Sequence, residues 1–341
     1  MSSARLRALV VCPGRGSYGK FQLGSLKNGS PIISKLDAFR ASLNRPTITE
    51  LDSAERYSGL KHVAGENASL LTFAATANDV SQLDPEKVDV IAVAGNSMGF
   101  YTALYASGAL DLMEAARLVE TMGDRQRKNV IGGQVLYPIV DEDWVESPSQ
   151  KSTVQEVLTW ENTFESISLG GTAVIGGDTE AVRKILRDMP KIIHGLREYP
   201  VQLPLHSAFH TPLMNETSDW AHSVLSDLSI RAPKIPLVAG DGRIFGRWAS
   251  TDEILDYTLG SQVVDPYDFS KSIKSALYDY APDTVVLPGP GDTMGNPVAT
   301  IMIKIGWRGL RDKADFIEAQ RSDSPVIISM TRENQRSLVV I

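Results

Sequence analysis

A serine at a sharp predicted turn is the strongest chemical feature of this 341-residue sequence. The apolar run VDVIAVAG predicts a buried strand that leads directly into Gly95, Asn96, Ser97, Met98 and Gly99, and a helix-forming run begins at once. A G-x-S-x-G motif between a strand and a helix is typical of a nucleophile elbow, which exposes its serine at the end of a sheet. Ser97 is therefore predicted to be a nucleophile, and its hydroxyl needs a base.

Two of the five histidines stand out as candidates for that base. The segment LPLHSAFHTPLMNE holds His206 and His210, and Pro212 restricts the backbone just beyond them. From the residues alone, both histidines are candidates.

A glycine-rich stretch near the N-terminus, VVCPGRGSYGKF, resembles two phosphate-binding motifs. As a P-loop it fails, because Phe21 stands where a magnesium-binding Ser or Thr is required. As a dinucleotide fingerprint it lacks a second strand that ends in an acidic residue; Asp37 has about the right spacing, but SPIISKLDAFRASL reads as a helix. We therefore expect a loop beside Ser97 and no nucleotide site.

The elements that must position these residues indicate an α/β fold. Apolar runs at ALVVC, VDVIAVAG, IPLVAG and DTVVLPG, separated by helical periodicity, predict a parallel sheet covered on both faces. Residues 131–203 instead predict a β-α-β-β-α-β order whose last strand is LREYPVQLP, which is typical of a ferredoxin-like unit. We expect a large α/β-hydrolase-like catalytic domain at residues 1–130 and 204–341, with this small subdomain inserted.

Composition limits the classes of function. A net charge of -7 gives no reason to expect a nucleic-acid or membrane partner, and no run reaches the roughly 18 apolar residues of a membrane span. We expect a cytoplasmic protein. Cys12 is the single cysteine, so an internal disulfide or a multi-thiolate metal site is excluded, and we expect this side chain to pack at a strand end.

Several motifs together resemble one family. PGRGS, GNSMGFYTALYASGAL, RLVETMG, SAFHTPLM and DPYDFSKSI occur in the order and approximate spacing of the malonyl-CoA:acyl-carrier-protein transacylases, and nearly the whole chain is covered. The resemblance implies a serine acyltransferase of fatty-acid or polyketide biosynthesis. Such an enzyme moves an acyl group from acyl-CoA to the phosphopantetheine thiol of an acyl carrier protein through an acyl-serine, without a metal or a redox cofactor. The inserted ferredoxin-like unit also belongs to that family.

The resemblance assigns roles to individual residues. Ser97 matches the nucleophile and His210 matches its base, while the backbone N–H groups of Arg15 and Met98 match the oxyanion hole. The segment DPYDF matches the one that orients the histidine through a backbone carbonyl, which places this role at Asp268. The other candidate histidine falls outside the match, so we expect it to be structural.

The sequence departs from the family around the acyl pocket. Arg15 stands where the family usually has glutamine, Asn96 replaces a histidine, and Met122 replaces the arginine that grips the malonyl carboxylate. Because methionine cannot pair with a carboxylate, we expect an acyl group without a free carboxylate, unless Arg15 or Arg125 supplies the cation.

Other interpretations stay open at this point. An acyl-ACP or acyl-CoA thioester hydrolase on the same fold would share the first half-reaction, and a catalytically weak scaffold that binds carrier proteins would fit the three substitutions. An α/β-hydrolase explains the elbow, but that fold usually places its histidine late in the chain, and none follows His222.

Overall fold

A six-stranded sheet forms the centre of the larger part of the molecule. The computed structural model describes residues 5–26, 29–128 and 130–340. Among these residues the sheet has the strand order β10-β9-β2-β1-β11-β12. Its strands, in chain order, are β1 (Leu6–Cys12), β2 (Val88–Gly95), β9 (Leu237–Val238), β10 (Ile244–Phe245), β11 (Thr284–Leu287) and β12 (Ile327–Ser329).

The sheet is parallel except at one edge, where β10 runs antiparallel to β9. The pairing of β1 with β2 ends with Cys12 opposite Gly95, so the loops that follow these two strands leave the sheet side by side. Parallel strands are buried on both faces, which explains their continuous apolar sequences. The predicted α/β class and parallel sheet are confirmed.

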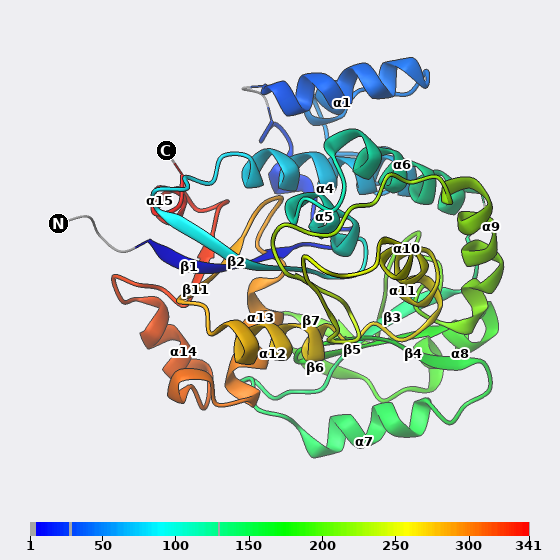
Figure 1. Cartoon of the computed structure of the whole chain (residues 1–341). Coiled ribbons are helices and arrows are strands. Elements are labelled where there is room, and N and C mark those ends of the chain that lie inside the picture. The colour runs from blue at the N-terminus through cyan, green and yellow to red at the C-terminus, as the bar shows by residue number, and fades with distance from the viewer. Residues whose placement is uncertain (1–4, 27–28, 129, 341) are drawn as a thin grey trace.

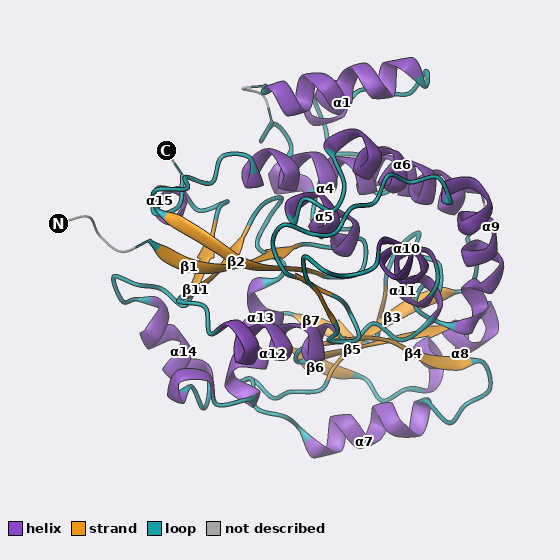
Figure 2. Cartoon of the chain, in the orientation of Figure 1, coloured by secondary structure: helices purple, strands orange, loops and turns teal. Residues whose placement is uncertain are grey.

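Helices cover both faces of this sheet (Figures 1 and 2). In Figure 1, α4, α5 and α6 lie on one side, and α12 and α13 lie on the other. The helices of the larger part are α1 (Pro31–Ser42), α2 (Ile48–Asp52), α3 (Gly59–His62), α4 (Gly65–Val80), α5 (Gly99–Ala106), α6 (Leu112–Lys128), α9 (Asn215–Leu225), α10 (Thr251–Leu259), α11 (Ser261–Val264), α12 (Phe269–Tyr280), α13 (Gly295–Lys304), α14 (Lys313–Gln320) and α15 (Glu333–Arg336).

A second, antiparallel sheet is formed by the middle of the chain, in the order β4-β5-β3-β8. This order places β5 between β3 and β4, which is the split β-α-β arrangement that the sequence predicts. Its elements are β3 (Gly133–Pro138), α7 (Pro148–Val157), β4 (Thr163–Leu169), β5 (Thr172–Gly177), α8 (Thr179–Asp188) and β8 (Val201–Gln202). All of them lie within the predicted insert, whereas its division from the rest as a separate domain stays a prediction.

One detail of the insert differs from the expectation. The predicted last strand LREYPVQLP is divided at Pro200 into β7 (Arg197–Tyr199) and β8, and β7 pairs with β6 (Ile192–His194) as a separate hairpin. Proline has no backbone N–H to donate to a neighbouring strand, so a continuous ladder ends there.

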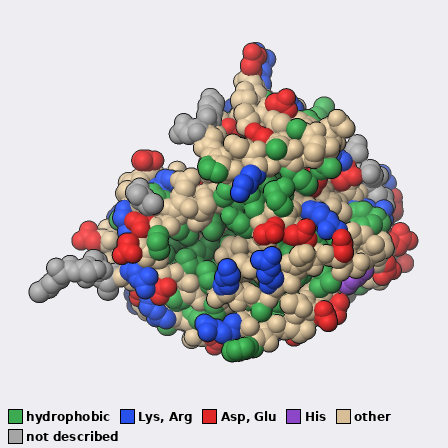
Figure 3. Space-filling view, turned by 45° about the horizontal axis from the view of Figure 1, so that its top comes forward, with side chains coloured by type: hydrophobic (Ala, Val, Ile, Leu, Met, Phe, Trp, Pro, Cys, Tyr) green, Lys and Arg blue, Asp and Glu red, His purple; other side chains and the backbone are tan. Residues whose placement is uncertain are grey.

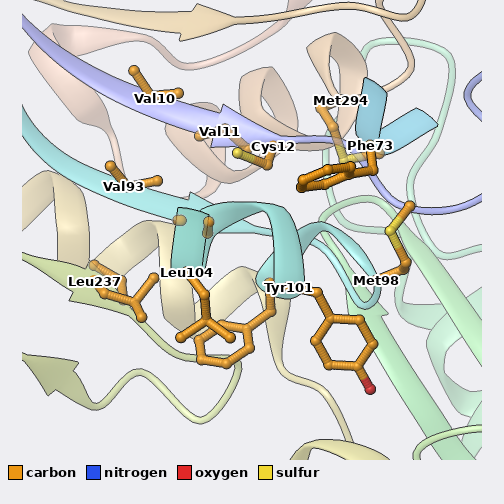
Figure 4. Packing of buried hydrophobic residues seen from close by; sticks show 14 of the residues in the cluster. Val10, Val11, Cys12, Phe73, Val93, Met98, Tyr101, Leu104, Leu237 and Met294 are labelled. Carbon is orange, nitrogen blue, oxygen red and sulfur yellow. The ribbon is translucent and has the colours of Figure 1, made fainter. Parts of the chain in front are cut away.

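The main core lies between the six-stranded sheet and its helices. Figure 4 shows Val10, Val11 and Cys12 of β1 with Phe73 of α4 and Met294 before α13. Burial raises the pKa of the Cys12 thiol, which packs at the end of its strand as expected.

The surface carries charges of both signs. Figure 3 shows hydrophobic side chains gathered near the centre of one face, with basic and acidic side chains interspersed around them. Among the described residues, no helix is both long enough and apolar enough to cross a bilayer.

Candidate active site

Ser97 sits in a tight turn between β2 and α5. Its φ angle is 54°, in the left-handed region that non-glycine residues rarely adopt. The turn is so narrow that a Cβ on Gly95 would lie 2.2 Å from the backbone of Gly99, and one on Gly99 would lie 2.3 Å from the oxygen of Cys12. Both glycines are therefore required by space, and the turn holds Ser97 in one strained conformation.

The structure brings Ser97 together with His210. The Ser97 hydroxyl lies 2.7 Å from Nε2 of His210, although the two residues are 113 positions apart in the sequence. His210 also has a left-handed backbone, with a φ of 61°, and its N–H donates to the oxygen of Val263 at 2.8 Å. The pair has the geometry of a nucleophile and its base.

A backbone carbonyl holds the other side of the imidazole ring. Nδ1 of His210 lies 2.6 Å from the oxygen of Gln262, which can only accept, so Nδ1 carries the proton and Nε2 is free to accept from Ser97. The prediction that Asp268 orients the histidine is therefore wrong. Asp268 instead caps α12, where its carboxylate accepts from the N–H of Lys271 at 2.8 Å.

Gln262 has a second role that the sequence analysis missed. Its side-chain Nε2 donates to the backbone oxygen of Ser97 at 3.0 Å, and its Oε1 accepts from the Tyr101 hydroxyl at 2.9 Å. One residue thus contacts the nucleophile through its side chain and the base through its backbone. The only available signal was its position shortly before DPYDF.

Burial sets the protonation of the pair. It lowers the pKa of His210 to about 4, and the hydrogen bond to Gln262 opposes this shift. The ring is therefore neutral at neutral pH and can take a proton from Ser97.

Two backbone donors lie free beside the nucleophile. Within the described residues, the N–H groups of Arg15 and Met98 donate to no acceptor. The loop after β1 touches the elbow, because a Cβ on Gly14 would lie 2.8 Å from the oxygen of Asn96. The two N–H groups are therefore available to an oxyanion.

These residues open onto a cavity of about 410 Å³ between the two sheets. The larger part contributes Ser97 and His210, and the insert contributes mostly apolar side chains. The lining residues from the insert include Leu136, Ile167, Leu169, Val174 and Arg197. A cavity of this size with a mostly apolar lining and a few polar groups is typical of a small-molecule site.

Three residues at which the sequence departs from the family lie on this cavity. Met122, on α6, is buried in its wall, and Asn96 is buried with an Oδ1 that has no hydrogen-bond partner in the described part of the chain. Arg15 also lines the cavity. Arg125 does not, because its guanidinium lies over the ring of Trp220, 5.1 Å from the ring centre.

His206, the second candidate base, does not approach Ser97 through any hydrogen bond. Its Nδ1 lies 3.0 Å from the oxygen of Pro204, and its Nε2 accepts from Nε of Arg15 at 3.3 Å. Across residues 5–26, 29–128 and 130–340, no group of three or more His, Cys, Asp or Glu side chains is placed to hold a metal ion.

Comparisons with known proteins find malonyl transacylases and polyketide synthases among the relatives of this chain. No protein-family model matches the chain. It is 24% identical over 286 residues to the malonyl CoA-acyl carrier protein transacylase of Escherichia coli K12, which covers 81% of this chain and 89% of that protein.

Solved structures give the same picture of the fold. The malonyl-CoA:ACP transacylase of Synechocystis superposes with a TM-score of 0.73 at 17% identity, over 97% of this chain and 99% of that one. A malonyl-transacylase solved in complex with its type II polyketide acyl-carrier protein superposes with a TM-score of 0.68 at 21% identity, over 86% of this chain and 93% of that one.

Proposed function

Since this chain is a distant relative of the malonyl-CoA:acyl-carrier-protein transacylases, we propose that it is a serine acyltransferase, which moves an acyl group from acyl-CoA to the thiol of an acyl carrier protein. The observation that carries the proposal is the line of hydrogen bonds from Ser97 through His210 to the oxygen of Gln262, open to one cavity. Its setting is fatty-acid or polyketide biosynthesis, the pathways in which carrier-protein thioesters are used.

The first half-reaction follows from the geometry. The Ser97 oxygen attacks the thioester carbonyl while His210 Nε2 takes the hydroxyl proton. The N–H groups of Arg15 and Met98 stabilise the tetrahedral oxyanion, by about 3 kcal/mol for each donor in well-studied cases. The C–S bond then breaks, the leaving thiolate takes the proton from His210, and an acyl ester remains on Ser97.

The second half-reaction uses the same groups in the reverse direction. His210 takes the proton of the carrier thiol, the sulfur attacks the ester, and Ser97 recovers its proton as the carrier thioester leaves. The relative solved with its carrier protein supports this choice of acceptor. The proposed steps use neither a metal nor a redox cofactor, since acyl transfer between sulfur and oxygen changes no oxidation state and His210 carries the proton; acyl-CoA enters as a substrate.

Which acyl group the protein accepts depends on the charges that line the cavity. Met122 brings no cation to the α6 wall, which favours an uncharged acyl group unless another cation is present. Of the two arginines that would compensate, Arg15 lines the cavity and Arg125 does not.

The test follows the fate of the acyl group. The protein is incubated with a series of acyl-CoA thioesters and a phosphopantetheine-bearing carrier, and carrier mass and free CoA are measured over time. Acylation of the carrier that matches CoA release supports the transferase. CoA release without carrier acylation would instead indicate a thioester hydrolase, and no CoA release with any thioester would indicate a binding scaffold.

A further inference from the structure

The N–H group of Arg15 belongs to the same peptide unit as the carbonyl of Gly14. This peptide bond is trans, so its C=O and N–H bonds lie in one plane and point in opposite directions. Ser17 is buried, and its hydroxyl donates to the oxygen of Gly14 at 2.9 Å. Because this contact holds the oxygen, it also holds the direction of the N–H on the other side of the peptide plane.

A second hydroxyl holds the first. Oγ of Ser17 lies 2.7 Å from Oγ1 of Thr293, although 276 positions separate the two residues in the sequence. The Gly14 oxygen can only accept, so it takes the single hydroxyl proton of Ser17, and Thr293 must donate to Ser17. The hydrogen bonds therefore run in one direction, from Thr293 through Ser17 to the Gly14–Arg15 peptide. Hydrogen bonds in such a series polarise one another, which strengthens the Arg15 N–H as a donor.

The loop that carries Thr293 is tied to the helices at its start. It joins β11 to α13, and the N–H of Gly289 donates to Oδ2 of Asp79 at 2.7 Å. The Thr76 hydroxyl donates to the oxygen of Gly289, and Asp79 also pairs with Arg336 at 2.8 Å. Thr76 and Asp79 both lie on α4, which covers the large sheet. These contacts give Thr293 a defined position from which it holds Ser17.

The second oxyanion donor has the same arrangement. The N–H of Met98 shares a peptide unit with the oxygen of Ser97, and that oxygen accepts from Nε2 of Gln262 at 3.0 Å. The backbone N–H of Phe100 also donates to it, at 2.9 Å. Each of the two free N–H groups beside the nucleophile thus belongs to a peptide unit whose carbonyl is held by a side chain.

We propose that Ser17, held by Thr293, is a positioning residue of the oxyanion hole, which aims the Arg15 N–H at the carbonyl oxygen of the acyl group. The inference rests on the proposed acyltransferase function, since this N–H acts when an oxyanion forms beside Ser97. The hydroxyl proton of Ser17 is already donated to Gly14, so its effect passes through that peptide. The sequence analysis assigned a donor to residue 15 and gave Ser17 no role.

The first test compares Ser17→Ala with Ser107→Ala. Ser107 is also buried, and its hydroxyl also donates to the carbonyl three positions earlier, that of Leu104 at 3.1 Å, but it follows the C-terminal end of α5 and does not line the cavity. Acylation of Ser97 by acetyl-CoA and by malonyl-CoA is followed by intact mass over a range of thioester concentrations.

We expect Ser17→Ala to lower the maximal rate of acylation about tenfold and to change the half-saturating concentration by less than about twofold, because the oxyanion forms only in the transition state. The loss is smaller than the roughly 100-fold or more that follows complete removal of an oxyanion donor. Ser107→Ala should stay within about twofold of the wild-type rate, since its hydroxyl supports no part of the site.

The carbonyl stretching band of the acyl ester on Ser97 reports directly on the hydrogen bonds to that carbonyl. Hydrogen bonds to a carbonyl oxygen lower its stretching frequency. In infrared difference spectra with an isotopically labelled acyl carbonyl, we therefore expect a higher frequency in Ser17→Ala than in the wild-type protein and no change in Ser107→Ala. A general loss of stability would slow acylation without moving this band.

Thr293 offers a second pair of variants. Thr293→Val keeps the shape of the side chain and loses the hydroxyl, whereas Thr293→Ser keeps the hydroxyl. Because Thr293 is exposed, water can replace part of its effect, so we expect a maximal rate about threefold lower in Thr293→Val. Thr293→Ser should acylate at the wild-type rate. If Ser17→Ala does not fold, this pair decides the proposal.

The contrary outcomes separate this proposal from the function on which it rests. A wild-type rate in folded Ser17→Ala, or a slower rate with an unmoved carbonyl band, would overturn the positioning role and leave the acyltransferase function standing. Equal rates for Thr293→Val and Thr293→Ser would overturn the part assigned to Thr293. Wild-type protein that no thioester acylates would refute the acyltransferase function itself, and the role of Ser17 with it.

Discussion

The Nδ1 atom of His210 lies 2.6 Å from the backbone oxygen of Gln262, so a main-chain carbonyl, and not a carboxylate, orients the imidazole ring. The carbonyl carries no negative charge with which to stabilise an imidazolium ion. The backbone of Gln262 therefore fixes the position of the ring, burial keeps the ring neutral, and the residues around Gln262 become testable parts of the site.

Asp268 should be dispensable for chemistry. Its carboxylate caps α12 by accepting from the Lys271 N–H. We expect Asp268→Ala to lower the free energy of unfolding by about 1 kcal/mol, the usual value of such a cap, and to leave kcat within about twofold. Urea unfolding and steady-state kinetics check this. A loss of activity above tenfold in a folded variant would return Asp268 to the catalytic site.

The Tyr101 hydroxyl should matter through Gln262. Removing it in Tyr101→Phe leaves the buried Oε1 of Gln262 without its partner, which costs about 1–3 kcal/mol of stability. We expect kcat to fall several-fold with a smaller change in KM, because Gln262 also contacts both Ser97 and His210. Tyr105→Phe is the matched control, since the Tyr105 hydroxyl makes no hydrogen bond within the described residues and its loss should leave kcat unchanged.

The pH dependence of acylation should reflect the buried base. His210 has a pKa of about 4, so the rate of Ser97 acylation should stay high well below the ordinary histidine value of about 6.5 and reach half its maximum near pH 4. Single-turnover acylation followed by acid quench and mass measurement from pH 3.5 to 8 checks this. A half-maximal rate near pH 6.5 would show that the base is exposed to water.

The same shift links stability to pH. The folded pKa of His210 lies below the unfolded value, so between about pH 4 and 6.5 the unfolded chain binds more protons than the folded one. The part of the free energy of unfolding that depends on keeping this ring neutral is fully present above pH 6.5. It is lost as the pH falls toward 4. Urea unfolding at pH 5 and pH 7.5 should show less stability at pH 5, and this difference should shrink in His210→Gln.

The elbow glycines should tolerate no side chain. A Cβ on Gly95 would lie 2.2 Å from the Gly99 backbone, so Gly95→Ala must displace the elbow and should lose at least about 3 kcal/mol of stability. Gly59→Ala is the control, because a Cβ on Gly59 meets nothing within 4 Å and the backbone there has no positive φ. Thermal unfolding of the two variants compares them, and equal melting temperatures would contradict the packing described for the elbow.

The sequence predicted those features whose cause is local. The elbow depends on small residues at fixed spacing around Ser97, and the buried parallel strands depend on continuous apolar runs. Both features can therefore be predicted from the sequence alone. The β-α-β-β-α-β order of the insert followed from the same periodicity. Within the insert, the hairpin of β6 and β7 was missed, because Pro200 divides what was predicted as one strand. In the large sheet, the short strands β10 and β12 were missed.

The missed parts of the site depend on long-range placement. Any residue can offer a backbone carbonyl, so the type of residue 262 gave no signal that His210 would donate to it. The direction of the Arg15 side chain depends on Gln126 and Leu205, which are more than a hundred residues away in the sequence. Sequence reasoning identified Arg15 through its backbone role and left the role of its side chain open.

The most direct test of the central claim is the mass of the protein after reaction with acyl-CoA. Wild-type protein is mixed with malonyl-CoA or acetyl-CoA, quenched in acid within seconds and measured intact, beside Ser97→Ala treated in the same way. We predict one acyl adduct per chain, located on the peptide that contains Ser97 and absent from the variant. An unmodified wild-type protein with every acyl-CoA, or an equal adduct on Ser97→Ala, would contradict the assignment of Ser97 as the nucleophile.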